Sequence, residues 1–249
     1  MQTPMAMSLV WSPALAGLVF TFLAALAIVL TQKWHGKITF DAAQGIQKFH
    51  TIATPRIGGL SLIVGLACAW LFLPFGGVRQ NLLGMLLLGA LPAFVFGFAE
   101  DLTKRISVRA RLLATATSGL LAAWLTGYWV SFVNVPILDS LLALAPIGLL
   151  FTAVAVAGIA NSVNIIDGFN GLASGVVILM LLTLAIIAYR VDDIAITQLA
   201  LLGVFSTFGF LIINFPKGHL FLGDAGAYFL GYYVSVLAVA LAMRNPLDV

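Results

Sequence analysis

The sequence contains very little charge. Only 8% of its 249 residues are Asp, Glu, Lys or Arg, whereas soluble domains usually contain about 25%. Hydrophobic residues make up 62% of the chain, and the mean hydropathy is +1.11. A soluble globule of this length could not bury so much apolar surface. The composition therefore excludes an ordinary soluble protein and predicts one that crosses a lipid bilayer several times.

Other signals are missing as well. Cys68 is the only cysteine, which excludes an internal disulfide and leaves the redox compartment open. The first apolar run has no basic leader and is long enough to span, so no cleavable signal peptide is expected. No soluble domain, repeat or low-complexity tail is visible. The pI near 9.2 would suit nucleic acid, but the basic residues are placed as in a membrane topology, and no nucleic-acid partner is expected.

Long uncharged stretches predict the membrane spans. Each is close to the ~20 apolar residues that a spanning helix needs, and none alternates in the way that barrel strands do. We therefore predict an all-α polytopic membrane protein with about eight transmembrane helices, forming a single transmembrane domain over residues 1–249. The stretches are 9–31, 57–78, 80–99, 112–138, 140–166, 168–189, 194–216 and 225–243.

The basic residues indicate an orientation. Eight spans place both termini on one side, and the connections then alternate between the two sides. All but three of the twelve Lys and Arg residues fall on the side opposite the termini, the exceptions being Arg79, Arg190 and Arg244. The positive-inside rule makes that richer side cytoplasmic. We therefore expect an inner (plasma) membrane protein with both ends on the outer side.

Four connections on the cytoplasmic side hold most of the polar residues. They contain "KFHTIATPRIGG" from Lys48, "AEDLTKR" from Ala99, "NSVNIIDGFNGLASG" from Asn161 and "NFPKGHLFLGDAGAY" from Asn214. The outer connections are short and nearly featureless. Any chemistry is therefore expected at the cytoplasmic interface.

The third of these segments has a helical polar face. Asn161, Asn164 and Asp167 follow one another at steps of three, so they share one face of a helix, whereas Asn170 would point away from it. Gly168 lets the helix end near Asp167, so that the chain turns back. Polarity this close to a bilayer suggests function. The segment is expected to wrap its polar groups around a small concavity.

Acids and bases of these loops suit phosphate chemistry. The acids are Glu100, Asp101, Asp167 and Asp224. The basic residues are Lys48, Arg56, Lys104, Arg105 and Lys217. Mg²⁺ prefers oxygen ligands and usually takes one or two carboxylates plus substrate phosphates, while Lys and Arg neutralise phosphates. The pattern predicts phosphoryl transfer with a lipid or nucleotide substrate.

Simpler roles compete with this interpretation. Asn161 and Asn164 could be hydrogen-bond links between helices, and the acidic pair could merely pair with Lys104 and Arg105. Arg109 and Arg111 are interpreted as topology determinants or contacts to anionic lipid. Asp192 and Asp193, on the outer side, are expected to be solvated. A transporter is the second functional class, although transporters tend to place polar sites near the bilayer midplane.

The four segments together resemble a known family. "NSVNIIDGFNGLASG" resembles the N-x-x-N-x-x-D-G-x-x-G-L-A signature of polyprenyl-phosphate N-acetylhexosamine-1-phosphate transferases, also called glycosyltransferase family 4, which include the phospho-MurNAc-pentapeptide translocases. "FPKGHLFLGDAGAYFLG" resembles the second signature of this family. "TPRIGG" resembles its first loop and "AEDL" its Asp-Asp loop. The resemblance covers nearly the whole chain, with the motifs in family order.

The resemblance implies a reaction and its participants. A polyprenyl (undecaprenyl) phosphate attacks the β-phosphate of a UDP-sugar in the presence of Mg²⁺, with Mn²⁺ as an alternative, and UMP leaves. By motif, Asp224 is the main metal ligand, with Asn164 beside it, and Glu100, Asp101 and Asp167 are catalytic acids. The remaining residues are implied in binding the nucleotide or the phosphates: Asn170 at the uracil, Phe221 stacked on the base, Asn214, Lys48 and Lys104. A homodimer is compatible with the resemblance.

Three departures from the family pattern qualify this picture. Glu100 replaces an Asp, which keeps the charge but lengthens the side chain. Asn170 is often Asp in the peptidoglycan translocases, so the chain looks closer to the branch that initiates O-antigen, enterobacterial-type or teichoic glycans. The family also has further C-terminal helices and a histidine-rich loop, which have no counterpart before Val249. An inactive truncated member is therefore an alternative to an active enzyme.

Overall fold

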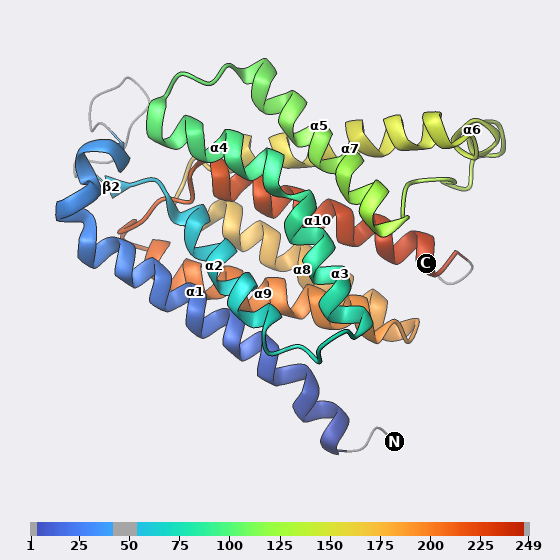
Figure 1. Cartoon of the computed structure of the whole chain (residues 1–249), viewed down its shortest axis with the longest axis horizontal. Helices are drawn as coiled ribbons and strands as arrows, with labels where there is room; N and C mark the ends of the chain where they lie inside the picture. Colours follow the sequence, from blue (N-terminus) through green and yellow to red (C-terminus); the bar gives the residue numbers. More distant parts are fainter. Residues whose placement is uncertain (1–3, 42–53, 247–249) are drawn as a thin grey trace.

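The computed structural model describes residues 4–41 and 54–246. Within these ranges the chain forms ten α-helices and one short ribbon (Figure 1). The helices are α1 Pro4–Thr39, α2 Gly58–Trp70, α3 Val78–Gly89, α4 Leu91–Thr103, α5 Val108–Thr126, α6 Pro136–Leu142, α7 Ala145–Ile166, α8 Leu172–Arg190, α9 Ile194–Asn214 and α10 Gly223–Arg244. The predicted helical architecture is confirmed.

The exception is a ribbon of two strands, β1 Phe40–Asp41 and β2 Thr54–Pro55. Phe40 pairs with Pro55 and Asp41 with Thr54 in antiparallel register. The sequence analysis expected no strands, and the ribbon is too short to leave an alternating pattern. It joins the end of α1 to the segment that leads into α2.

Five helices in the described ranges are long and apolar enough to cross a membrane: α1, α7, α8, α9 and α10. A sixth span is formed if α3 and α4 count together, although they are bent by 45°. The bend falls at Ala90, and Pro92 lies in the first turn of α4. Proline has no N–H to donate to the preceding turn and its ring clashes with that turn, so the helix bends there. The chain is therefore a multi-pass membrane protein.

The expected number of eight spans is not shown. The stretch 57–78 contains α2, which has only 13 residues and at ~1.5 Å per residue is shorter than a bilayer core of ~30 Å. The stretch 112–138 contains most of α5, which has 19 residues like α8 but is less apolar, with Arg109 and Arg111 in its first turn and Gly127 at its end. Apolar composition shows which segments avoid water, but it does not show where the backbone turns.

Helix α10 is the centre of the bundle and packs against α7, α4 and α2. Every residue from Gly223 to Leu237 is buried. Small residues let the backbones approach closely: a Cβ atom at Gly97 would lie 2.7 Å from the Cα of Ala225, and one at Gly231 would lie 2.6 Å from the Cα of Ala160. The contact at Ala225 fixes the first turn of α10, where Asp224 lies, and the contact at Gly231 fixes the middle of the helix.

The connections gather at two ends of the bundle (Figure 1). The ribbon lies at one end, on the left of the figure, where Lys104 of the α4–α5 connection donates to the carbonyl of Phe40 at 3.1 Å. Phe221, before α10, donates its N–H to the carbonyl of Pro55 at 2.8 Å. The first residues of α1 and the last of α10 lie at the opposite end. The described parts of the four polar connections thus meet, as predicted.

A polar cluster closes the opposite end. Arg244 of α10 donates from Nε to Oδ2 of Asp193 at 2.6 Å and from Nη1 to the hydroxyl of Tyr128 at 3.0 Å. Burial alone would raise the pKa of the Asp193 carboxyl, but hydrogen bonds from Arg244 and Asn245 outweigh it and hold that pKa below its ordinary value. The expectation that Asp193 is solvated is wrong, because it ties the start of α9 to the end of α10.

Candidate functional site

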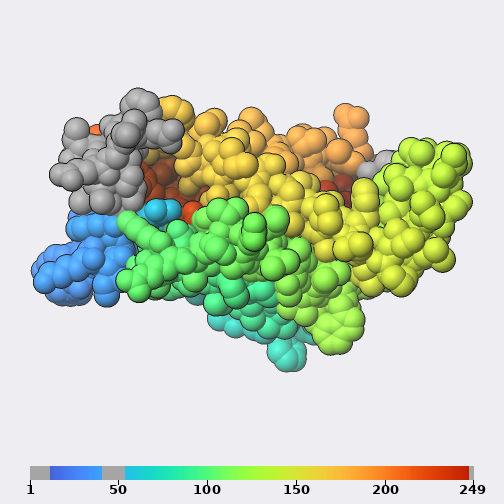
Figure 2. Space-filling model, turned by 90° about the horizontal axis from the view of Figure 1, so that it is seen from above, coloured from blue at the N-terminus to red at the C-terminus, as the bar shows by residue number. Residues whose placement is uncertain are grey.

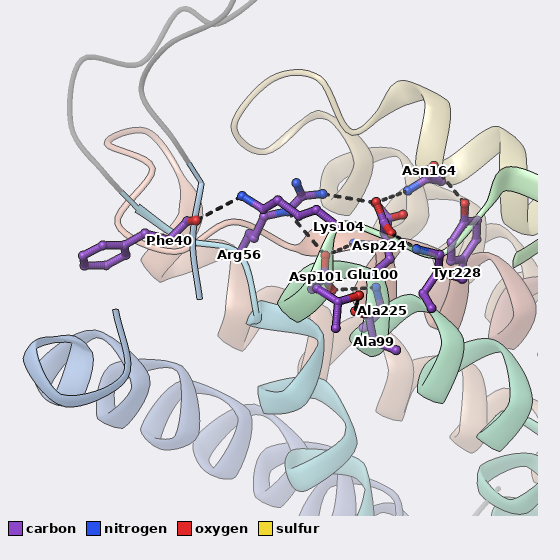
Figure 3. A network of polar contacts seen from close by, with 12 residues as sticks. Phe40, Arg56, Ala99, Glu100, Asp101, Lys104, Asn164, Asp224, Ala225 and Tyr228 are labelled. Atoms are coloured by element: carbon purple, nitrogen blue, oxygen red, sulfur yellow. Dashed lines mark hydrogen bonds and ion pairs between the residues drawn. The ribbon is translucent and has the colours of Figure 1, made fainter. Parts of the chain in front are cut away.

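Asp224 is the junction of a polar network at the end of the bundle that carries the ribbon (Figure 3). Its Oδ1 accepts hydrogen bonds from Arg56 Nη2 at 3.3 Å and from Asn164 Nδ2 at 3.1 Å. Its Oδ2 forms an ion pair with Arg111. The residue itself is only 6% exposed. Three elements, the segment after β2, α5 and α7, therefore direct donors at one carboxylate from the start of α10.

Asp101 stabilises the start of α10. It is fully buried, and its two oxygens accept the backbone N–H groups of Asp224, at 2.8 Å, and Ala225, at 3.0 Å. Arg56 Nε lies 3.4 Å from its Oδ1. The first N–H groups of a helix have no partner within the helix and carry partial positive charge, so a carboxylate there is favourable. Asp101 thus positions Asp224 from another helix.

Glu100 and Lys104 organise the connection after α4. Glu100 accepts the N–H of Ile106 through Oε2 at 2.7 Å. Lys104 has a positive φ of 55°, where it ends α4. The ammonium group of Lys104 donates to the carbonyl of Phe40, so it links this connection to the ribbon. Both residues therefore lie beside the Asp224 network and shape its border.

Asn164 and Asp167 come from the C-terminal end of α7. Tyr228 of α10 donates its hydroxyl to Oδ1 of Asn164 at 3.2 Å, so the nitrogen of that amide is the end that faces Asp224. Asp167 follows the last residue of α7, as predicted. Burial raises the pKa of Asp167 to about 8, the nearby Asp224 carboxylate adds to the shift, and Arg56 opposes it. The Asp167 carboxyl therefore retains a proton more readily than an exposed one.

Asn161 has the simpler of its two proposed roles. Its Nδ2 donates to the hydroxyl of Thr115 on α5 at 3.3 Å and to the carbonyl of Ala157 at 2.7 Å. It therefore links α7 to α5, while Asn164 turns to α10. The two asparagines share a helix face, but they serve different neighbours.

Two residues expected to bind the nucleotide, Asn170 and Asn214, lie at the α7–α8 and α9–α10 connections. Asn170 donates from Nδ2 to the carbonyl of Pro216 at 3.2 Å. Asn214 is 5% exposed and uses both ends of its amide, accepting from Gly171 N–H at 2.6 Å and donating to the Leu220 carbonyl at 2.8 Å. Asn214 thus cross-links the two loops. Beside them lies a pocket of about 520 Å³, lined by Phe169, Asn170, Gly171, Leu172, Leu211 and Phe215.

The remaining basic residues and one missed tyrosine have different outcomes. Arg111, interpreted only as a topology determinant or a contact to anionic lipid, also pairs with Asp224, so it does more than that interpretation allowed. Arg109, two residues earlier, is exposed. Lys48 lies outside the described residues. Tyr228 was missed because a tyrosine in an apolar helix carries no signal of its own, although its spacing of four from Asp224 places both on one helix face.

The surface above the network is hollowed. In the space-filling view, red atoms of α10 are visible at the bottom of a depression between the green atoms of α5 and the yellow atoms of α7 (Figure 2). Arg56 and Arg111 are 23% and 15% exposed at their side chains. A ligand with phosphate groups can therefore approach two guanidinium groups and the Asp224 carboxylate from this side.

The donor set limits which metal ion fits. Within residues 4–41 and 54–246, no group of three or more His, Cys, Asp or Glu side chains lies close enough to enclose a metal. Mg²⁺ usually keeps waters and binds through one or two carboxylates plus substrate phosphates. Asp224, with Asp167 near it, fits an ion of that kind, which takes most of its ligands from the substrate and water.

Comparisons with known proteins identify a family. Residues 83–242 match the family model described as glycosyl transferase family 4. The chain is similar to the probable undecaprenyl-phosphate N-acetylglucosaminyl 1-phosphate transferase of Bacillus subtilis (strain 168), at 31% identity over 193 residues, which cover 78% of this chain and 53% of the relative. It is also similar to the phospho-N-acetylmuramoyl-pentapeptide-transferase of Clostridium perfringens (strain 13 / Type A), at 30% identity over 199 residues, covering 76% and 62%.

A third relative is matched over more of this chain. The phospho-N-acetylmuramoyl-pentapeptide-transferase of Clostridium beijerinckii is 27% identical over 254 residues, covering 95% of this chain and 76% of the relative. The chain spans between about half and two thirds of the length of the first two relatives. The matched range 83–242 contains Glu100, Asp101, Asp167 and Asp224. The chain therefore belongs to glycosyl transferase family 4.

Proposed function

We propose that the protein transfers a sugar-1-phosphate, from a UDP-linked N-acetylhexosamine, to polyprenyl phosphate. An oxygen of the lipid phosphate attacks the β-phosphorus of the sugar nucleotide, and a new phosphorus–oxygen bond forms. The bond from that phosphorus to the bridging oxygen breaks, and UMP leaves with the oxygen and its electron pair. The product is a polyprenyl-diphosphate sugar, which would begin a cell-surface glycan.

The observation that carries this proposal is the convergence on Asp224. One buried carboxylate receives two guanidinium groups and an amide from three separate elements at the end of a membrane bundle. Phosphoryl transfer relies on positioning and on the neutralisation of phosphate charge. Asp224 lies in the range that matches the family model. The similar proteins carry the names of a 1-phosphate transferase and a phospho-pentapeptide-transferase.

The arginines would neutralise the diphosphate. Arg56 and Arg111 both contact Asp224, and both remain partly exposed on the hollowed side. Guanidinium groups suit phosphate because their N–H groups form parallel hydrogen bonds with it. We propose that they contact the donor phosphates when substrate binds, and that Lys104 and Lys48 add positive charge near the same groups.

Asp167 would act at the reacting phosphate. With its pKa raised to about 8, the carboxyl holds a proton at neutral pH in the absence of substrate and can donate a hydrogen bond to a phosphate oxygen. The arrival of further cations would lower that pKa and release the proton. Glu100 and Asp101 are assigned to the shape of the site, through Ile106 and the start of α10.

Magnesium is the metal that these residues fit. Asp224 would be its main ligand, with Asp167 as the second carboxylate and Asn164 in contact with Asp224. A bound Mg²⁺ would polarise the phosphoryl group and balance its charge. Asn170 and Phe221 would contact the nucleotide next to the loop junction that Asn214 holds.

The placement of charge supports an orientation. We propose that the ribbon end faces the cytoplasm of a bacterial inner membrane and that both chain ends lie on the outer side, through eight crossings in which α2 and α5 take part. The basic residues favour this end. The departure at Asn170 favours the branch that initiates O-antigen, enterobacterial-type or teichoic glycans.

The deciding experiment measures UMP release. Membranes that contain the full chain receive undecaprenyl phosphate, Mg²⁺ and a panel of UDP-sugars, with Asp224→Asn as the matched control. We expect UMP from at least one UDP-N-acetylhexosamine, and none above background from the variant at equal insertion. Absence of UMP from correctly inserted wild type with every donor would favour an inactive family member, and solute uptake into liposomes would favour a transporter.

A further inference from the structure

Tyr228 lies one helical turn after Asp224 on α10. Its side chain is 2% exposed, and its hydroxyl donates to Oδ1 of Asn164 at 3.2 Å (Figure 3). Asn164 in turn donates from Nδ2 to Oδ1 of Asp224 at 3.1 Å. The two helix residues therefore hold the same amide between them, one at each end.

The hydrogen bonds from Tyr228 through Asn164 to Asp224 can run in only one direction, because of the chemistry of the three side chains. An ionised carboxylate only accepts hydrogen bonds, an amide has one accepting and one donating end, and a phenol can donate its O–H. If the Asn164 amide were flipped, its oxygen would face the oxygen of Asp224. With the hydroxyl of Tyr228 on Oδ1, the nitrogen remains directed at Asp224.

We propose that Tyr228 is a positioning residue, whose hydroxyl holds the Asn164 amide with its N–H toward Asp224 and thereby fixes the Asp224 carboxylate. This proposal rests on the proposed function, because it assigns a role in the same site. Partners that hydrogen-bond to a ligating carboxylate orient it, and their loss commonly weakens metal binding by about 10- to 100-fold. Tyr228 acts through Asn164, so its loss is expected to cost less.

The chain offers a matched control on the same helix. Tyr233 is fully buried, and its hydroxyl donates to the backbone carbonyl of Leu199 at 2.8 Å. Tyr228→Phe and Tyr233→Phe each remove one buried hydroxyl and leave one oxygen acceptor without its hydrogen-bond donor. Any loss of stability should therefore be similar, whereas only Tyr228→Phe disturbs the Asp224 network.

The experiment measures Mn²⁺ affinity by electron paramagnetic resonance on the full chain in nanodiscs, with Mn²⁺ in place of Mg²⁺, alongside UMP release. Tyr228→Phe is expected to weaken Mn²⁺ binding by about 3- to 10-fold, in line with the loss of one neutral hydrogen bond. Tyr233→Phe should leave it within about 2-fold, since its hydroxyl has no contact with the site. In an Asn164→Ala background, Tyr228→Phe should add nothing further.

Each outcome has one meaning. Unchanged Mn²⁺ affinity in Tyr228→Phe, an equal loss in Tyr233→Phe, or a loss that persists without Asn164 would overturn the positioning role. Wild type that binds no Mn²⁺ through Asp224 would overturn it too. If the affinities shift as expected but wild type releases no UMP, the positioning role stands and the proposed transfer reaction fails.

Discussion

Asp101→Asn tests whether the buried acid of the "AEDL" segment supports α10 or acts on substrate. The change keeps the size of the side chain and removes its charge. Asn retains one oxygen for the two N–H groups of Asp224 and Ala225, which Asp101 binds at 2.8 and 3.0 Å. The amide nitrogen would then face a backbone N–H, so that two donors meet in a fully buried place.

The size of the effect follows from these contacts. A hydrogen bond to a charged group contributes about 1.5–3 kcal/mol, and a buried donor left without a partner costs about 1–3 kcal/mol. The lost charge at a helix N-terminus adds about 0.3–1 kcal/mol. Relief of the cost of burying a charge offsets part of this. We expect the free energy of unfolding to fall by about 2–4 kcal/mol.

Thermal denaturation in detergent, followed by tryptophan fluorescence, measures the stability, and Mn²⁺ affinity reports on Asp224. Asp101→Asn should lower the unfolding midpoint and weaken Mn²⁺ binding together, because the first turn of α10 carries Asp224. Glu100→Gln is the control, since the amide oxygen of glutamine can still accept the N–H of Ile106 that Glu100 Oε2 accepts. A variant with wild-type stability and no turnover would refute this reasoning and make Asp101 a catalytic acid.

Three further predictions concern other residues. Arg111→Gln should reduce UMP release at least ~10-fold, since it removes a charged partner of Asp224, while Arg109→Gln at an exposed position should not; equal effects would contradict the ion pair. Arg244→Gln should lower the unfolding midpoint, because Asp193 loses a charged partner, and Arg190→Gln at an exposed position serves as control. An unchanged midpoint would mean that the Arg244–Asp193 ion pair contributes nothing to stability. Because the pKa of Asp167 is raised from 3.8 to about 8, its stabilising contribution is complete below about pH 4 and is lost as pH rises to 8. Wild type without substrate should therefore lose thermal stability over that range relative to Asp167→Asn, and parallel pH profiles would contradict the raised pKa.

Much of the candidate site could be predicted from local sequence. The end of α7 at Asp167, the return of the chain toward Asn170 and the meeting of the polar connections follow from glycine positions and from alternating membrane crossings. Local patterns did not distinguish Arg111 from Arg109, because both are basic residues at the start of one helix. Their difference depends on which one faces α10.

The sequence by itself determined that the chain is helical and lies in a membrane, because its apolar residues are too many and too continuous for a soluble core. It also determined the family, through motifs that keep their order along the chain. Only the tertiary structure decided which helices are long enough to span, since the break at Ala90 and the early end of α2 at Trp70 leave little trace in composition. It also decided that Asp101 caps α10 and that Tyr228 holds Asn164, because these contacts join residues that are far apart in sequence, and side-chain direction across a helix interface is set by packing.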